Sequence, residues 1–355
     1  MENYIKPEVY ILHEYDSKSH FSALYNSHQK GNIVIKDYII LSRLTIIKRF
    51  IKAILNRKNV LEALKTFIKE SYNTFKLKNI EDSILIVGIA PYNKLLNRYQ
   101  NVFKKNKSIY FTSWQEWNGN SFPRGKINNK NKFEKILKSN FYSVACVSKK
   151  TQNEVSNFFE KSEVVNHSIN IKEYSKKKLY NVEIGRKKII YLGQLIKRKN
   201  IEMILNYMNS NSEDIEVAFA GSGKLTSEII SRSQKDKRIK YLGILKKDEI
   251  KTVLKDYDFL ILPSKDEPFG IVLIEALASG IPCIVSNCYG PIEIVKDGYN
   301  GYIFDKNSKL DFEKVMNKAI NLDYKKFNQL SKNCLKASED YDCDFIFKKW
   351  ENLIN

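Results

Sequence analysis

The 355-residue sequence has few long apolar stretches and few cysteines. It contains no run of about 18 uncharged apolar residues, so no segment is expected to span a membrane. Acidic residues stand near its start, where a signal peptide needs basic and then purely apolar residues. The five cysteines are scattered and odd in number, which argues against a disulfide framework, and no cysteine and histidine spacing indicates zinc. We therefore expect a cytoplasmic protein.

Acidic residues are fewer than basic ones, and the excess of basic residues is unevenly distributed along the chain. The formal net charge is +20. Residues 1–180 hold 32 Lys and Arg against 15 Asp and Glu, whereas residues 181–355 hold 28 against 25. This asymmetry favours a polyanion or an anionic membrane surface as a partner of the first half. A lysine-rich composition with solvated side chains is the alternative.

The chain is long enough for two domains, and its apolar runs alternate with helical stretches. Such alternation predicts parallel, doubly wound sheets whose ligand crevice lies beyond the carboxyl ends of the strands. In the first half, strands are expected at residues 9–13, 32–41, 83–89, 108–113 and 143–147.

A basic amphipathic helix is predicted for residues 43–56, and a helix over residues 60–75 repeats its pattern. Such a helix can pack on the sheet, or it can lie in a membrane interface and be attracted to anionic lipid.

The most informative stretch is 257–304. A strand is expected at 259–262, and residues 271–278 have helical spacing, with Gly280 and Pro282 ending the helix.

Glu267 and Glu275 bracket the turn where the loop becomes this helix. The first helical N–H groups lack intrahelical acceptors, and the helix dipole adds positive charge there, so a phosphate is their natural ligand. The two carboxylates could then accept hydrogen bonds from hydroxyls on either side of a bound diphosphate. For either glutamate alone an ordinary solvated charge is the favoured interpretation, and the combination of the two favours a binding site instead. The backbone N–H groups expected at the phosphate are those around Gly270, Ile271 and Val272.

These residues carry a resemblance to a known family. Glu267-Pro-Phe-Gly-Ile-Val-Leu-Ile-Glu275-Ala, with Asp297-Gly-Tyr-Asn-Gly301 after it, resembles the E-x7-E region of family 4 retaining glycosyltransferases of the GT-B fold. The resemblance covers about residues 165–335 well and the first half only in the order of strands and helices. It implies two Rossmann-like domains with an interdomain cleft, a nucleotide-sugar donor in the second domain, and an acceptor against the first.

The resemblance also implies roles for residues. Lys199 matches a lysine that holds the donor diphosphate, Gln194 replaces the usual arginine, and Arg198 or Lys197 can compensate. Glu267 would hold donor-sugar hydroxyls and Glu275 the ribose, so Lys199, Arg198 and Glu267 are the expected catalytic residues. No cofactor or metal is expected, because cationic side chains and the helix N-terminus would neutralise the leaving diphosphate. The donor-binding residues implied are Gly193, Gln194, Lys199, Gly221, Gly223, Lys224, Gly243, Ile244, Glu267, Phe269, Gly270, Ile271, Val272 and Glu275.

On the acceptor side the sequence departs from the family. No glycine-rich turn follows the first strand, so the side chains of Ser17, Lys18 and His20 could contact an anionic group instead, although His20 reads equally as a surface histidine.

The histidine that many members place after the strand at 108–113 is also missing, and Ser113-Trp114 stands there. Trp114 and Trp117 could stack on a sugar, with Glu116 as a polar contact, or the two tryptophans could simply cap the sheet.

The expected domains are an acceptor-binding domain over 1–171, a linker over 172–187, a nucleotide-sugar-binding domain over 188–338 and a terminal helical segment over 339–355. By resemblance that segment crosses back onto the first domain, with Trp350 as an anchor.

Asp256 and Asp258 look like the D-x-D metal motif of the other major glycosyltransferase fold. They precede a buried strand, so solvated loop carboxylates are expected instead.

The function implied is a retaining, metal-independent transfer of a sugar from a nucleotide-sugar to a glycan or lipid-linked acceptor. The expected setting is surface polysaccharide assembly, as for capsule or O-antigen, on a protein peripheral to the inner face of the plasma membrane. Two alternatives stay open: a non-catalytic GT-B subunit that binds a nucleotide sugar or glycan, and a glycosyltransferase acting on nucleic acid. No nucleic-acid motif is recognisable.

Overall fold

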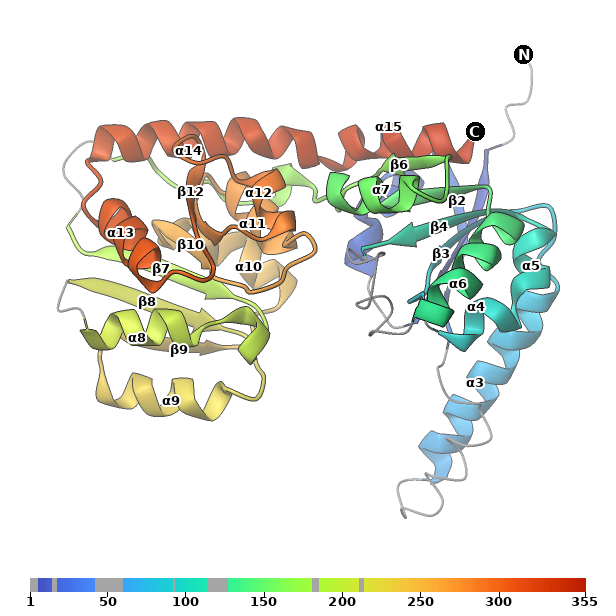
Figure 1. Ribbon diagram of the computed structural model, residues 1–355, viewed down its shortest axis with the longest axis horizontal. Helices are drawn as coiled ribbons and strands as arrows, with labels where there is room; N and C mark the ends of the chain where they lie inside the picture. The colour runs from blue at the N-terminus through green and yellow to red at the C-terminus, as the bar shows by residue number, and fades with distance from the viewer. Residues whose placement is uncertain are drawn as a thin grey trace. The chain divides into compact units, whose positions relative to one another are not determined.

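The computed structural model describes residues 6–14, 18–41, 60–91, 93–113, 127–180, 185–210 and 214–355. The chain forms two compact units (Figure 1). The first unit comprises Met1–His167 together with Ile346–Asn355, and the second comprises Ser168–Phe345.

The first unit contains a six-stranded parallel sheet in the order β2-β1-β3-β4-β5-β6. Its strands are β1 (Glu8–His13), β2 (Val34–Ile40), β3 (Ile84–Gly88), β4 (Lys107–Thr112), β5 (Ser143–Cys146) and β6 (Ser162–Val164). Its helices are η1 (Lys18–Phe21), α1 (Ser22–Gln29), α3 (Val60–Lys78), α4 (Lys94–Arg98), α5 (Gln100–Lys104), α6 (Ile127–Asn140) and α7 (Lys149–Ser156). The five strands predicted for this half are confirmed to within one or two residues at each end. The helix predicted over 43–56 lies outside the described residues.

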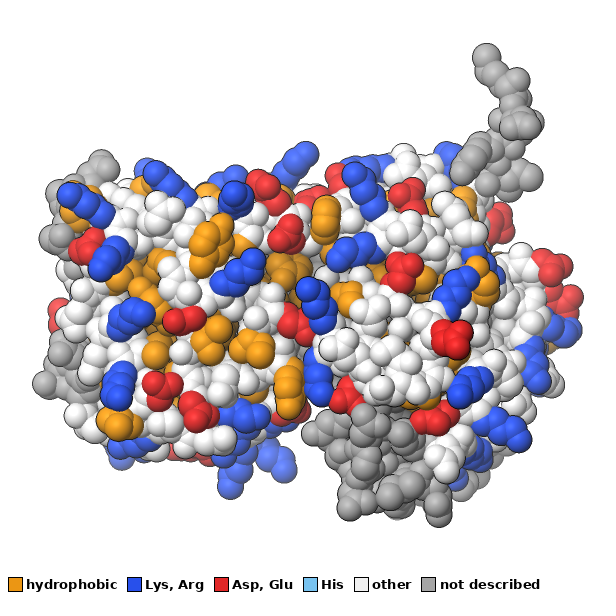
Figure 2. Space-filling view, turned by 45° about the horizontal axis from the view of Figure 1, so that its top comes forward, with side chains coloured by type: hydrophobic (Ala, Val, Ile, Leu, Met, Phe, Trp, Pro, Cys, Tyr) orange, Lys and Arg blue, Asp and Glu red, His pale blue; other side chains and the backbone are white. Residues whose placement is uncertain are grey.

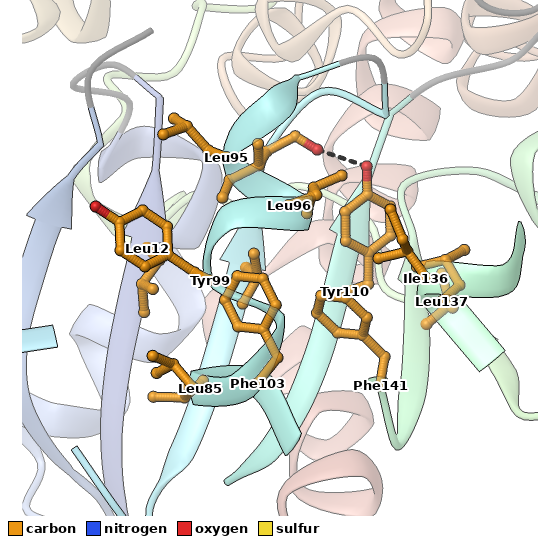
Figure 3. Packing of buried hydrophobic residues seen from close by; sticks show 14 of the residues in the cluster. Leu12, Leu85, Leu95, Leu96, Tyr99, Phe103, Tyr110, Ile136, Leu137 and Phe141 are labelled. Atoms are coloured by element: carbon orange, nitrogen blue, oxygen red, sulfur yellow. Dashed lines mark hydrogen bonds between the residues drawn. The ribbon is translucent and has the colours of Figure 1, made fainter. Parts of the chain in front are cut away.

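The core of this unit is formed by apolar side chains from the strands and from the helices that cover them (Figure 3). Tyr110 of β4 is fully buried and donates its hydroxyl hydrogen to the carbonyl oxygen of Ile89. Phe103 and Phe141 lie with their ring centroids 5.1 Å apart beside it. Because every strand of a parallel sheet is covered on both faces, its strands read as nearly continuous apolar runs, which is why the sequence predicted them well.

The second unit repeats the architecture with the strand order β12-β11-β10-β7-β8-β9, again all parallel. Its strands are β7 (Lys187–Leu192), β8 (Ile215–Ala220), β9 (Ile239–Gly243), β10 (Phe259–Leu262), β11 (Cys283–Ser286) and β12 (Gly301–Phe304). Its helices are η3 (Ile171–Glu173), η4 (Lys197–Lys199), α8 (Glu202–Ser210), α9 (Thr226–Lys235), α10 (Lys247–Val253), η5 (Leu254–Asp256), α11 (Ile271–Ala278), α12 (Tyr289–Ile294), α13 (Lys309–Ile320), α14 (Tyr324–Ser338) and η6 (Glu339–Tyr341). The last helix, α15 (Cys343–Ile354), begins in this unit, and its residues from Ile346 onward belong to the first. The predicted two-domain, Rossmann-like α/β fold is therefore confirmed.

Helix α11 is largely buried. Every residue from Leu273 to Ala278 is buried. Gly270 precedes the helix with φ = 93°, and Gly280 follows it with φ = 73°, both in the left-handed region that favours glycine. The helix bounds predicted from the sequence are confirmed.

The polar segment before β7 is held on the second unit by side chains. Lys177 forms an ion pair with Asp258 at 3.1 Å, and the Tyr180 hydroxyl donates to the same carboxylate. The other oxygen of Asp258 accepts the Lys188 backbone N–H at 2.8 Å. The prediction that Asp258 is solvated is therefore wrong, because three hydrogen-bonding partners compensate its burial, whereas Asp256 is exposed as expected.

Among the described residues, no helix is both long enough and apolar enough to cross a membrane. Figure 2 shows Lys and Arg side chains spread over one face of the molecule, interspersed with acidic ones.

Candidate functional site

The second unit gathers glycines at the carboxyl ends of the neighbouring strands β7, β8 and β9. Gly193 donates its N–H to Ala220 at 3.0 Å, and Gly221 donates to the carbonyl of Gly243 at 2.7 Å. A Cβ on Gly221 would lie 1.9 Å from the carbonyl oxygen of Gly193, so no larger residue fits there. The three backbones therefore meet where a Rossmann-like sheet binds its ligand.

Two loops meet next to this edge. The Lys265 N–H donates to the carbonyl of Arg198 at 2.9 Å, and Arg198 Nη1 donates to the carbonyl of Asp266 at 2.6 Å. These bonds fix the turn η4 against the loop that follows β10. The sequence placed the two segments 68 residues apart, and the parallel order β10-β7 brings them together.

Lys199 and Glu267, both predicted site residues, form an ion pair across these two loops. Each side chain is only 11% exposed. Burying either charge alone would be costly, so each charge is held in place by the other. The sequence predicted both as site residues but did not predict that they form an ion pair.

The loop ends at the N-terminus of α11. The Gly290 N–H donates to the Glu267 carbonyl at 3.2 Å, and a Cβ on Gly290 would lie 2.5 Å from the Phe269 nitrogen. Phe269 itself is buried, whereas Ile271 and Val272 at the start of the helix are half-buried. The first N–H groups of α11 thus follow Glu267 closely in the chain. The loop that joins Glu267 to the helix is held in place by close backbone packing.

Glu275 lies one turn inside α11 and is 6% exposed. Its Oε1 accepts the hydroxyl hydrogen of Tyr174 at 2.9 Å. Burial raises the pKa of Glu275 to about 7, and the Tyr174 hydrogen bond opposes that rise. Burial and the neighbouring carboxylate also raise the pKa of Tyr174. Sequence reasoning missed Tyr174, because it lies in a lysine-rich stretch that carries no motif.

Comparison with known proteins agrees with this geometry. Residues 172–337 match the family described as Glycosyl transferases group 1. The chain therefore carries a glycosyl transferases group 1 domain, and the predicted resemblance is confirmed for residues 172–337.

Two curated relatives illustrate the match. An uncharacterized glycosyltransferase of Methanocaldococcus jannaschii is 30% identical over 184 residues, which is 46% of this chain and 47% of that protein. The UDP-Gal:alpha-D-GlcNAc-diphosphoundecaprenol alpha-1,3-galactosyltransferase of Escherichia coli is 32% identical over 131 residues, or 36% of this chain and 33% of that protein. The match thus spans less than half the length of both relatives.

A solved structure extends the likeness in fold to nearly the whole chain. HepE of Anabaena, in complex with UDP and glucose, aligns with a TM-score of 0.70 and 14% identity over 98% of each chain. At this identity the likeness concerns the fold.

Several predicted donor-side residues are exposed to solvent, among them Arg198 and Gly223. Gln194 and Lys224 are exposed, and Ile244, which follows β9, is 72% exposed. Within the described part of the chain, no group of three or more His, Cys, Asp or Glu is arranged to hold a metal ion.

On the acceptor side, four predicted residues, Ser17, Trp114, Glu116 and Trp117, lie outside the described residues. The other two belong to η1. The ammonium group of Lys18 lies 5.8 Å from the ring centroid of Tyr38. His20 lies beside two further histidines that the sequence did not place with it.

Proposed function

We propose that the protein is a retaining glycosyltransferase that moves a sugar from a nucleotide-sugar donor to a glycan or lipid-linked acceptor, without a metal ion. The observation that carries this proposal is the Lys199–Glu267 pair next to the N-terminus of α11, within a glycosyl transferases group 1 domain. Surface polysaccharide assembly at the cytoplasmic membrane face is the proposed setting.

The donor side supports this chemistry through charge. As the glycosidic bond breaks, negative charge develops on the leaving diphosphate, and groups already oriented toward it lower the barrier. In the proposal, Lys199, Arg198 and the first N–H groups of α11 supply that stabilisation. Glu267 then accepts hydrogen bonds from donor-sugar hydroxyls, and Glu275 from the ribose.

The names of related proteins are consistent with this assignment. The Anabaena structure is described as a complex with UDP and glucose, and the Escherichia coli relative as a galactosyltransferase acting on a diphosphoundecaprenol-linked sugar. A nucleoside diphosphate and a lipid-linked glycan are therefore the first ligands to test.

Calorimetric titration with UDP and GDP tests the donor site. We expect at least one to bind the wild-type protein, and Glu275→Ala to weaken that binding. Glu313→Ala, which changes a glutamate of α13 whose partner is Lys309, is the matched control and should bind like wild type. Equal nucleotide affinity in the wild type and Glu275→Ala would contradict the ribose assignment. Turnover should persist in excess chelator, and strict dependence on added metal would contradict the metal-free mechanism.

A stripe of exposed apolar side chains on α3 supports a membrane surface as partner. Leu61, Leu64, Ile68, Tyr72 and Phe75 recur at helical spacing, and each is 40–70% exposed. In Figure 1, α3 extends away from the strands of its own unit. An apolar face on a basic half of the chain suits the headgroup region of an anionic bilayer. Exposed lysines accompany the stripe at Lys65 and Lys78.

Vesicle co-sedimentation tests this surface. Binding to phosphatidylglycerol-containing vesicles should exceed binding to pure phosphatidylcholine and should weaken as salt rises, because screening reduces the attraction between charges. The double variant Ile68→Ser with Phe75→Ser should bind less. Leu310→Ser changes a side chain of α13 that is 62% exposed and should leave binding unchanged. Equal binding to neutral and anionic vesicles would exclude this partner.

A further inference from the structure

Three of the four histidines of the chain form a cluster in the first unit. His13 is the last residue of β1, His20 lies in η1, and His167 follows the end of β6. The ring centroids of His13 and His20 are 5.8 Å apart, and those of His20 and His167 are 4.5 Å apart. The cluster thus lies at the carboxyl edge of the first sheet, where ligands of such sheets bind.

The cluster is built into the fold. A Cβ on Gly88 of β3 would lie 2.5 Å from His13 Cδ2, so the absence of a side chain there makes room for the His13 ring. The ring of Phe111 in β4 packs against His167 at 5.6 Å, and Phe21 packs against His13 at 5.9 Å. Five separate segments therefore contribute to one small site: β1, η1, β3, β4 and the residues that follow β6.

Exposure differs among the three rings. His13 and His167 are 5% and 4% exposed, whereas His20 is only partly buried. His20 is thus the histidine that a ligand can reach. The other two stand against it and limit how its ring can turn.

The site favours uncharged imidazoles. Burial, followed by the neighbouring His13, lowers the pKa of His20 to about 4. Burial and the neighbouring His20 likewise lower the pKa of His167. A neutral imidazole presents one N–H donor and one nitrogen acceptor, which matches the two roles of a hydroxyl group. A phosphate, by contrast, needs donors and positive charge.

We propose that His13, His20 and His167 form a binding site for an uncharged, hydroxyl-bearing sugar ring of the acceptor, with His20 as the contacting residue. His13 and His167 are positioning residues that hold the His20 ring. The buried rings of Phe21 and Phe111 pack against His13 and His167 and support the cluster from the core side, so that the partly exposed His20 ring faces the ligand. This inference rests on the proposed function, and it specifies which part of the acceptor the first unit binds.

Direct binding can be followed without turnover. The full-length protein is labelled with ¹³C-histidine, which gives signals from four histidines only. Methyl glycosides of glucose, galactose and N-acetylglucosamine are added in turn, and inorganic pyrophosphate serves as an anionic comparison. His28, an exposed residue of α1 outside the cluster, is the internal control.

We expect at least one glycoside to shift the cluster signals in a saturable way while the His28 signal stays constant. Pyrophosphate should not displace that glycoside. The proposal is overturned if no glycoside shifts the cluster, or if pyrophosphate competes with the glycoside for it.

Variants then distinguish a histidine that contacts the ligand from one that only holds it in position. His20→Ala should raise the acceptor KM roughly three- to tenfold, the range for one neutral hydrogen bond, and leave kcat at saturating acceptor unchanged. His20→Gln, which keeps a donor and an acceptor, should recover part of that loss. His167→Phe keeps a ring of similar shape and should raise KM less than His20→Ala, whereas His28→Gln should match wild type. A kcat loss without a change in KM would contradict the assignment.

The two proposals can fail separately. If no nucleoside diphosphate binds the second unit, the proposed function fails. If a nucleotide binds normally in wild type and His20→Ala while glycosides leave the cluster signals unchanged, only the acceptor inference fails.

Discussion

At the scale of single residues, the candidate site is defined by buried polar side chains that are paired with one another. Lys199 and Glu267 neutralise each other, and Glu275 is held by Tyr174. Each partner keeps the other's rotamer fixed before a ligand arrives, which reduces the reorganisation that binding requires.

Lys199→Ala is expected to slow sugar transfer by roughly 10- to 100-fold, because a charge-assisted contact to the leaving diphosphate is lost. It should also lower the melting temperature, since Glu267 would stay buried without its partner. Steady-state kinetics and thermal unfolding measure the two effects. Lys235→Ala changes an exposed lysine in the last turn of α9 and is the matched control, which should change neither.

Glu275→Gln is expected to change how stability depends on pH. The pKa of Glu275 is raised from its ordinary value of 4.5 to about 7, so the folded protein holds this proton more tightly than the unfolded chain. The contribution of Glu275 to stability is therefore complete below about pH 4.5 and is lost as pH rises through 7.

Glutamine cannot ionise, so the variant should gain stability relative to wild type between pH 5 and 8, on the order of 3 kcal/mol at most. Urea unfolding at several pH values measures the difference. A constant difference across this range would show that Glu275 is ionised throughout.

At the scale of elements, the turns at the strand ends form the carboxyl edge of the second sheet, where a Rossmann-like sheet binds its ligand. Gly221 allows its backbone to approach that of Gly193, and Gly270 starts α11 in a conformation that other residues avoid. The sequence predicts each of these glycine turns. Which turns contact one another depends on the order of the strands in the sheet.

Gly221→Ala is expected to destabilise the second unit by about 1–3 kcal/mol for the backbone strain alone, with the steric clash adding to it. The residue has φ = 133°, and its new Cβ would lie 1.9 Å from the Gly193 oxygen. Nucleotide affinity should fall as well. Gly185→Ala introduces a Cβ with nothing within 4 Å and is the control for both measurements.

At the scale of the whole molecule, the end of the chain completes the unit formed by its beginning. Trp350 of α15 is 1% exposed, and its ring lies 5.9 Å from that of Phe111. Lys107 Nζ donates to the Ile354 carbonyl at 2.8 Å. Residues almost 250 positions apart therefore share one core.

Trp350→Ala is expected to cost about 3–5 kcal/mol of stability in the first unit, because a large buried ring leaves a cavity. Calorimetry should show that the unfolding transition of the first unit moves to lower temperature. The transition that added nucleotide stabilises, assigned to the second unit, should not move. Lys348→Ala alters an exposed residue of the same helix and should leave both transitions in place. A shift of the nucleotide-stabilised transition alone would contradict this account.

By itself, the sequence determined the two parallel sheets, the family, and the identities of Lys199, Glu267 and Glu275 as site residues to test. It could do so because buried parallel strands, glycine turns and helix ends are local patterns. The roles assigned to these residues are still predictions, as are the domain boundaries drawn at 171 and 188.

Only the tertiary structure decided which of these groups touch. The Lys199–Glu267 pair, the Tyr174–Glu275 hydrogen bond and the burial of Asp258 join segments 68 to 101 residues apart. The histidine cluster joins residues 147 positions apart in its most distant contact. Contacts at such separations follow from strand order and crossover, which no local pattern encodes.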